Sequence, residues 1–214
     1  MPQQAVSTRL YLISPPLGGR AIAAFPDLLR SALSSGADVA SLLVRFETGA
    51  PGDLKNALRE IAAVAEIHDI AVLVQDDPRL AVRADVDGVH LSAPSEALAE
   101  AVKSLKPRRI VGVGGLRGRD AAMAAGEQGA DYLMFGIPDS AGAAAPLSAV
   151  LDLVEWWSDI FEPPCVGYAS ALEEVAEIAA AGAEFVALEA AVWGASSPAE
   201  ALAQAQVALD ALRS

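Results

Sequence analysis

Short apolar segments alternate with longer Ala- and Leu-rich segments along the whole chain of 214 residues, and eight of each can be counted. The short segments have the length of β-strands, and the longer ones show the apolar spacing of amphipathic helices. The predicted strands are residues 9–14, 38–45, 70–75, 88–91, 109–113, 131–135, 165–168 and 184–189. The predicted helices are residues 25–35, 53–68, 78–84, 95–105, 118–128, 146–161, 171–181 and 198–212.

Eight strand–helix units of similar length predict an α/β fold, a (βα)8 TIM barrel in which residues 1–214 form a single domain. The strands are apolar throughout, as in a parallel sheet that is covered on both faces. A Gly-Ala-Asp/Glu tripeptide recurs just before three of them, at 36–38, 129–131 and 182–184. There the glycine ends a helix and the acid opens the next strand. An open, doubly wound sheet is the alternative, but the count of eight favours closure.

Composition limits the partners of the chain. Its net charge is −13, so we expect repulsion from nucleic-acid phosphates and anionic lipid, and neither nucleic acid nor a membrane as a partner. The single cysteine, Cys165, excludes an internal disulfide framework and a cysteine-based zinc site, and we expect it to pack in the core. No apolar run approaches the roughly 20 residues of a membrane span, and no signal-peptide pattern opens the sequence. A cytoplasmic protein is expected.

In a (βα)8 barrel the functional groups come from the C-terminal ends of the strands. Gln75, Asp76 and Asp77 follow the third predicted strand, and two adjacent carboxylates there suit a hard cation such as Mg²⁺. The alternative is that Asp76 or Asp77 caps the helix that begins at Pro78. The two interpretations are compatible.

Arg45 ends the second predicted strand, where its guanidinium suits a phosphate or carboxylate ligand. The alternative is an ion pair with Glu47 or with another acid across the rim. His90 lies within an otherwise apolar strand and is either an acid–base group or a buried histidine that is hydrogen-bonded to neighbouring strands.

Small residues close the next three strands, namely Gly114, Gly136 and Ser170. Backbone N–H groups at Gly114 and Gly115 can reach an anion, and Gly114 is one of the candidate ligand contacts. Positive side chains are scarce at this end of the barrel. All three lysines fall on predicted helices or before the fifth strand, which leaves Arg45 as the principal cation.

Trp156 and Trp157 are adjacent on one predicted helix and therefore point about 100° apart. Both can hardly face the same core, so we expect one of them to be half-exposed. It marks either a subunit contact, as in a homodimer, or a ring that is folded back over its own helix.

Several segments together resemble the thiamine phosphate synthase/TenI family of (βα)8 barrels over nearly the whole chain. They are LYLIS, SLLVR, VLVQDDPRLA, DVDGVHLS, GADYLMFG and GAEFVALEAAVWG, at the first, second, third, fourth, sixth and eighth strands. DGVHL after a short third helix, with GADY two units later, is fairly specific to this family. The resemblance implies a transferase of thiamine biosynthesis. In the family reaction, hydroxymethylpyrimidine diphosphate loses pyrophosphate with the help of Mg²⁺ and is joined to thiazole phosphate.

Matched position by position, the resemblance implies that Arg45 and Asp76 are catalytic and that Asp76 is a metal ligand. It implies substrate contacts at Arg45, Gln75, His90, Gly114, Gly136 and Ser170. The family's second metal aspartate falls on Ser95, and its lysine after the second strand falls on Glu47.

Most other phosphate ligands of the family are replaced as well, including the Thr/Lys-rich loop at 138–145 and the Gly-Gly loop at 169–170. The expected function is therefore a synthase-like reaction with weakened or altered activity. The alternative is a non-catalytic paralogue that binds a small pyrimidine- or thiazole-type heterocycle or a protein partner. A barrel lyase or isomerase with an unrelated substrate is a third possibility.

Overall fold

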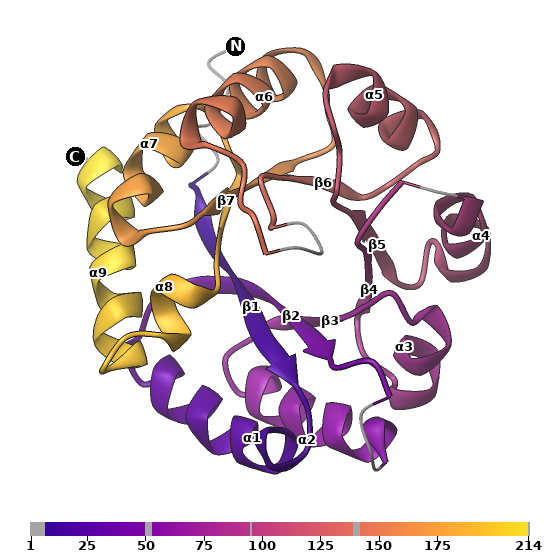
Figure 1. The fold of residues 1–214 in the computed structure, drawn as a ribbon, viewed down its shortest axis with the longest axis vertical. Coiled ribbons are helices and arrows are strands. Elements are labelled where there is room, and N and C mark those ends of the chain that lie inside the picture. Colours follow the sequence, from indigo (N-terminus) through magenta and orange to yellow (C-terminus); the bar gives the residue numbers. More distant parts are fainter. Residues whose placement is uncertain (1–6, 50–52, 95, 139–141, 214) are drawn as a thin grey trace.

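The computed structural model describes residues 7–49, 53–94, 96–138 and 142–213. Within these ranges, eight parallel strands close into a barrel in chain order, and β1 is hydrogen-bonded to both β2 and β8. Figure 1 shows the helices as a ring outside the strands. The predicted (βα)8 barrel is confirmed, and the open sheet is excluded.

The element bounds follow the predicted alternation closely. The strands are β1 (Arg9–Leu17), β2 (Val39–Phe46), β3 (Ala71–Gln75), β4 (Gly88–Leu91), β5 (Ile110–Val113), β6 (Tyr132–Phe135), β7 (Cys165–Ala169) and β8 (Phe185–Leu188). The helices are α1 (Arg20–Leu33), α2 (Leu54–Glu66), α3 (Pro78–Ala84), α4 (Glu96–Leu105), α5 (Arg119–Glu127), α6 (Leu147–Ile160), α7 (Val175–Ala180), α8 (Ala190–Trp193) and α9 (Pro198–Asp210), with 3-10 turns η1 (Leu172–Glu174) and η2 (Ala211–Arg213).

Three elements differ most from the prediction. β1 continues to Leu17 because, beyond a register shift, Pro16 and Leu17 pair with Arg45 and Phe46 of β2. Helix α1 begins at Arg20, before the predicted start at residue 25, and the short helix α8 between β8 and α9 was not predicted. All three differences lie at the C-terminal end of the barrel.

Side chains along each strand alternate between two cores. Leu10 and Leu12 of β1 pack with the helices in the outer core, whereas Tyr11 and Ile13 pack inside the barrel. This two-residue period is expected for strands that are buried on both faces. The inner core also contains Leu43, Leu73, Tyr132, Met134, Val166, Tyr168 and Ala187.

Acidic residues just before β4, β6 and β8 bind the start of the preceding strand. Each carboxylate accepts a hydrogen bond from a backbone N–H of that strand, so the predicted strand-opening acids Asp131 and Glu184, and also Asp87, stabilise the N-terminal face of the barrel. The bonds are Val72 N to Asp87 (2.7 Å), Val111 N to Asp131 (2.8 Å) and Cys165 N to Glu184 (2.9 Å).

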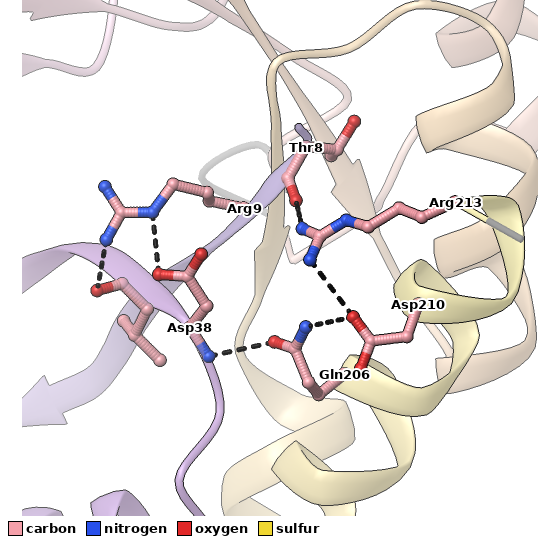
Figure 2. A network of polar contacts seen from close by, with 7 residues as sticks. Thr8, Arg9, Asp38, Gln206, Asp210 and Arg213 are labelled. Atoms are coloured by element: carbon pink, nitrogen blue, oxygen red, sulfur yellow. Dashed lines mark hydrogen bonds and ion pairs between the residues drawn. The ribbon is translucent and has the colours of Figure 1, made fainter. Parts of the chain in front are cut away.

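The same face carries a polar network that joins β1 and β2 to the last helix (Figure 2). Arg9 Nε donates to Asp38 at 2.7 Å, and Asp38 N donates to Gln206 Oε1 of α9 at 2.8 Å. Arg213 in η2 donates to the carbonyl oxygen of Thr8 at 2.9 Å. The two ends of the described chain are thereby held together where the barrel closes.

The tryptophan prediction is confirmed. Trp157 is 1% exposed and its Nε1 donates to the Pro163 carbonyl at 2.7 Å, whereas Trp156 is half-buried. The Arg119 guanidinium lies 4.9 Å from the centre of the Trp156 ring, so a cation already covers the more exposed tryptophan. A homodimer remains a prediction.

Cys165 is fully buried, and burial raises the pKa of its thiol, which confirms its expected role in packing. Among the helices in the described ranges, none has the length and apolar character needed to cross a bilayer.

Candidate active site

The two-residue period of the inner core identifies the residues that face the barrel mouth. Leu43 of β2 and Ala187 of β8 face the axis, so Arg45 and Glu189, two positions further along, face the C-terminal opening. By the same count from the other strands, this layer also contains Gln75, Gly114, Gly136 and Ser170. Five of the six predicted substrate contacts therefore lie in this layer, at the C-terminal end of the barrel, and only His90 lies elsewhere.

Arg45 is held from both sides. Its backbone N–H donates to Ser14 Oγ and its Nε donates to the Ser14 carbonyl oxygen, both at 2.9 Å. Its second terminal nitrogen forms an ion pair with Glu189, and the two side chains are 15% and 16% exposed. The alternative interpretation of an ion pair across the rim is confirmed. The partner is Glu189, whereas Glu47 is exposed.

The short helix α8 fixes the backbone that carries Glu189. Trp193, its last residue, donates from Nε1 to the Ile13 carbonyl of β1 at 2.6 Å, and its ring meets Phe25 edge-on at 5.2 Å. Sequence reasoning missed Glu189 as the partner of Arg45. The available signal was the two-residue period of β8: Ala187 faces the barrel axis, so Glu189 two positions later faces the mouth.

The two adjacent aspartates have different roles. Asp77 accepts a hydrogen bond from Leu80 N at 2.8 Å and caps α3, as one interpretation predicted. Asp76 has a positive φ of 54° and an exposed carboxylate that accepts from Ser92 N at 2.8 Å and from Gln75 Nε2 at 3.2 Å. Asp76 therefore joins the ends of β3 and β4 at the mouth.

The described residues include no group of three His, Cys, Asp or Glu side chains that could surround a metal ion. Ser95, where the second metal aspartate of the resembled family falls, lies outside the described residues. A single exposed carboxylate such as Asp76 fits only the kind of Mg²⁺ site in which water and substrate phosphates supply most ligands.

His90 lies in the barrel interior and is fully buried. Its Nδ1 is 2.8 Å from Tyr132 Oη, which in turn is 2.7 Å from Tyr11 Oη. Burial lowers the pKa of His90 to about 4, so the ring is neutral near pH 7. The interpretation as a buried, hydrogen-bonded histidine is confirmed, but the partner lies on β6 and not on a strand next to β4.

The other ring nitrogen of His90 is the unusual feature. Nε2 is buried and has no hydrogen-bond partner among the residues that the structure describes. A Cβ at Gly114 would come within 2.9 Å of it, so the glycine allows the close packing of β5 against Nε2. A contact between His90 and a ligand remains a prediction, and Nε2 is the atom available for it.

The pKa of His90 predicts a pH-dependent stability. Because its folded pKa of about 4 lies below the ordinary 6.5, the unfolded state binds more protons between these values. The free energy of unfolding should therefore fall by roughly 3 kcal/mol as the pH drops from 6.5 to 4. Urea titrations across this range should show that slope in the wild type and in His68→Gln, whose histidine is exposed, and a flatter one in His90→Gln. Parallel slopes in all three proteins would contradict the assignment.

Main-chain amides that follow β5 and β7 at the mouth, including the predicted amide of Gly114, are occupied within the protein. Ser170 N and Ala171 N donate to the Glu174 carboxylate at 2.6 and 3.4 Å. Gly114 N donates to the Leu91 carbonyl at 2.8 Å. Gly136 adopts a φ of 87°, and a Cβ there would come within 2.5 Å of a Val150 methyl group, which explains the glycine.

These groups set the chemistry of the mouth. The fixed guanidinium of Arg45 suits an anionic group, the exposed Asp76 suits a cation, and the buried neutral imidazole of His90 suits one hydrogen bond to an uncharged ligand atom. Burial and the nearby negative Glu189 raise the pKa of Tyr168 to about 12, so this phenol stays protonated.

Comparisons with known proteins show to which proteins this chain is similar. A family profile described as thiamine monophosphate synthase matches residues 10–192. The thiamine-phosphate synthase of Rhodospirillum centenum is 35% identical over 198 residues, which is 91% of this chain and 94% of that protein. That of Erythrobacter litoralis is 36% identical over 206 residues, covering 90% and 92% of the two chains. The solved thiamine phosphate pyrophosphorylase from Pyrococcus furiosus has the same fold, with a TM-score of 0.78, 19% identity and coverage of 99% and 100%.

Proposed function

The chain belongs to the thiamine monophosphate synthase family, and we propose that it is a synthase-type transferase whose activity on phosphorylated substrates is weakened. In this reaction the bond from the pyrimidine methylene to the diphosphate oxygen breaks, and its electron pair leaves with pyrophosphate. The thiazole nitrogen then supplies the pair for the new C–N bond. The observation that carries the proposal is the guanidinium of Arg45, fixed at the barrel mouth by Ser14.

Arg45 is suited to the leaving diphosphate. Negative charge grows on the leaving oxygens as the bond breaks, and a cation that is already fixed in place stabilises it without reorganisation. Ser14 and the ladder between β1 and β2 supply that fixation. The ion pair with Glu189 opposes it, because a carboxylate occupies the donor that the diphosphate needs.

Asp76 is the residue that would hold Mg²⁺, together with the phosphates of the substrate, and the ion would supply neutralising charge to the leaving group. Gln75 Nε2 donates to Asp76 and so orients this carboxylate. His90 Nε2, which is buried beside Gly114 and has no hydrogen-bond partner among the described residues, would bind one polar atom of a heterocycle. These roles for Asp76, Gln75 and His90 remain proposals.

The test is product formation from the two phosphorylated precursors with Mg²⁺, followed by chromatography of thiamine phosphate. We expect Mg²⁺-dependent product at a rate about 100-fold or more below that of the Rhodospirillum centenum relative assayed alongside, because one lost donor costs roughly 3–4 kcal/mol in the transition state. An Arg45→Met preparation controls for a contaminating synthase. If the two proteins have equal rates, the proposal that activity is weakened is wrong. If this chain forms no product at any protein concentration, the proposal that it is a transferase is wrong.

A second candidate is a non-catalytic protein that binds an uncharged heterocycle. It is favoured by Glu174, whose carboxylate accepts the hydrogen bonds of Ser170 N and Ala171 N. In a synthase these two amides would be free to bind a phosphate of the ligand. Calorimetry with the free hydroxymethylpyrimidine and its diphosphate separates the candidates. Binding that the diphosphate does not strengthen supports the second.

A further inference from the structure

We propose that Glu189 determines the specificity of the barrel mouth: its carboxylate is a built-in competitor on Arg45, and a phosphate or diphosphate that binds there has to displace this carboxylate or bind against its charge. This inference rests on the proposed function for the location of the site. Beyond that function, it assigns to Glu189 the choice between anionic and uncharged ligand groups.

The donor geometry of Arg45 carries the first step. A guanidinium binds a carboxylate or phosphate most strongly through two parallel N–H groups on one edge. Nε already donates to the Ser14 carbonyl, and the second terminal nitrogen is paired with Glu189. Both edges of the guanidinium that can bind an anion in this way include that second nitrogen. An anion that binds by two N–H groups therefore has to share this nitrogen with the Glu189 carboxylate and meets its negative charge at close range.

The placement of Glu189 carries the second step. Its side chain is only 16% exposed, and the helix that follows it is fixed to β1 by the hydrogen bond from Trp193 to Ile13. The carboxylate is thus held beside the guanidinium by the fold, unlike a mobile surface acid. A diphosphate that binds Arg45 has to push this carboxylate aside or bind despite the repulsion between the two negative groups.

The end of β7 shows the same arrangement independently. There the Glu174 carboxylate accepts from Ser170 N and Ala171 N, two amides that face the mouth end of the barrel. At both places an internal carboxylate occupies donors of the kind that bind phosphate. The mouth consequently favours uncharged ligand groups over phosphoanions.

The experiment is calorimetric titration with inorganic pyrophosphate in Mg²⁺-free buffer. We expect Glu189→Gln to bind it at least about tenfold more tightly than the wild type, a gain of the size of one hydrogen bond to a charged group. Glu189→Asp, which keeps the charge, should resemble the wild type. The matched control is Glu173→Gln, which removes one exposed negative charge at the same end of the barrel and should leave the affinity unchanged.

Two outcomes would overturn the inference: no gain in Glu189→Gln, or an equal gain in Glu173→Gln, which would reveal a general charge effect. Arg45→Met combined with Glu189→Gln must abolish the gain. If Glu189→Gln does not fold, Glu189→Ala removes the same carboxylate and must give the same result.

The readout is binding, so it is independent of turnover. A wild type that forms no product while Glu189→Gln gains pyrophosphate affinity would refute the proposed function and leave this inference standing. Normal product formation without a gain in Glu189→Gln would refute this inference alone.

Discussion

Arg45→Met should lower the kcat for thiamine phosphate formation by about a hundred- to a thousandfold. This range corresponds to roughly 3–4 kcal/mol, the cost of removing one fixed donor from a developing anion. The loss should fall mainly on kcat, because the charge on the leaving diphosphate exists chiefly in the transition state. Initial rates over a range of pyrimidine diphosphate concentrations measure it.

Two controls separate this effect from loss of fold. Arg20→Met removes an exposed arginine that follows β1 at the same end of the barrel, and it should leave kcat almost unchanged. Arg45→Met also leaves Glu189 half-buried and unpaired, so its stability should be compared with that of Arg45→Met/Glu189→Gln. If Arg45→Met folds and keeps the wild-type rate, Arg45 does not stabilise the leaving group.

Trp157→Ala should lower the free energy of unfolding by about 3–5 kcal/mol, the range for removing a large buried aromatic side chain. Trp157 is 1% exposed, stacks on Phe161 with ring centres 4.1 Å apart, and donates to the Pro163 carbonyl. The substitution removes these contacts and leaves a cavity between α6 and β6, where the indole meets Phe135. Urea unfolding followed by circular dichroism gives the value.

Trp156→Ala is the matched control on the same helix. Trp156 is half-buried, and its loss should cost about 1 kcal/mol, since a partly exposed ring leaves little cavity. Equal losses in the two variants would mean that Trp156 is buried in solution, for example against a second copy of the chain.

The sequence was sufficient to predict the barrel because its signal is repeated eight times and each repeat is a complete strand–helix unit. It was not sufficient for α8, since a helix of four residues has too few positions to show a period. The extension of β1 to Leu17 depends on pairing with Phe46, a contact between distant segments. Local pattern cannot show such contacts.

The sequence was sufficient to predict which strand ends meet at the candidate site. It was less informative about which side chains there form ion pairs and hydrogen bonds with one another. An acid opposite Arg45 was anticipated as one of two interpretations, and Glu189 became identifiable only once β8 was known to lie beside β1. The use of the Ser170 amide by Glu174 depends on the turn that leads into η1. Nε2 of His90 has no hydrogen-bond partner in the described part of the chain because of how the ring packs against Gly114, which the local sequence does not show.

The acids that precede the even-numbered strands bear on how such a chain is assembled. Asp87, Asp131 and Glu184 each join an even strand to its odd predecessor, and Asp38 does so through Arg9. These four carboxylates pair the strands two by two, β1 with β2, β3 with β4, β5 with β6 and β7 with β8. The contact before β5 is of another kind, since Arg109 donates to Asp85 ahead of β4. A duplication or exchange of segments that is cut between these pairs, rather than within one, would keep all four carboxylate bonds.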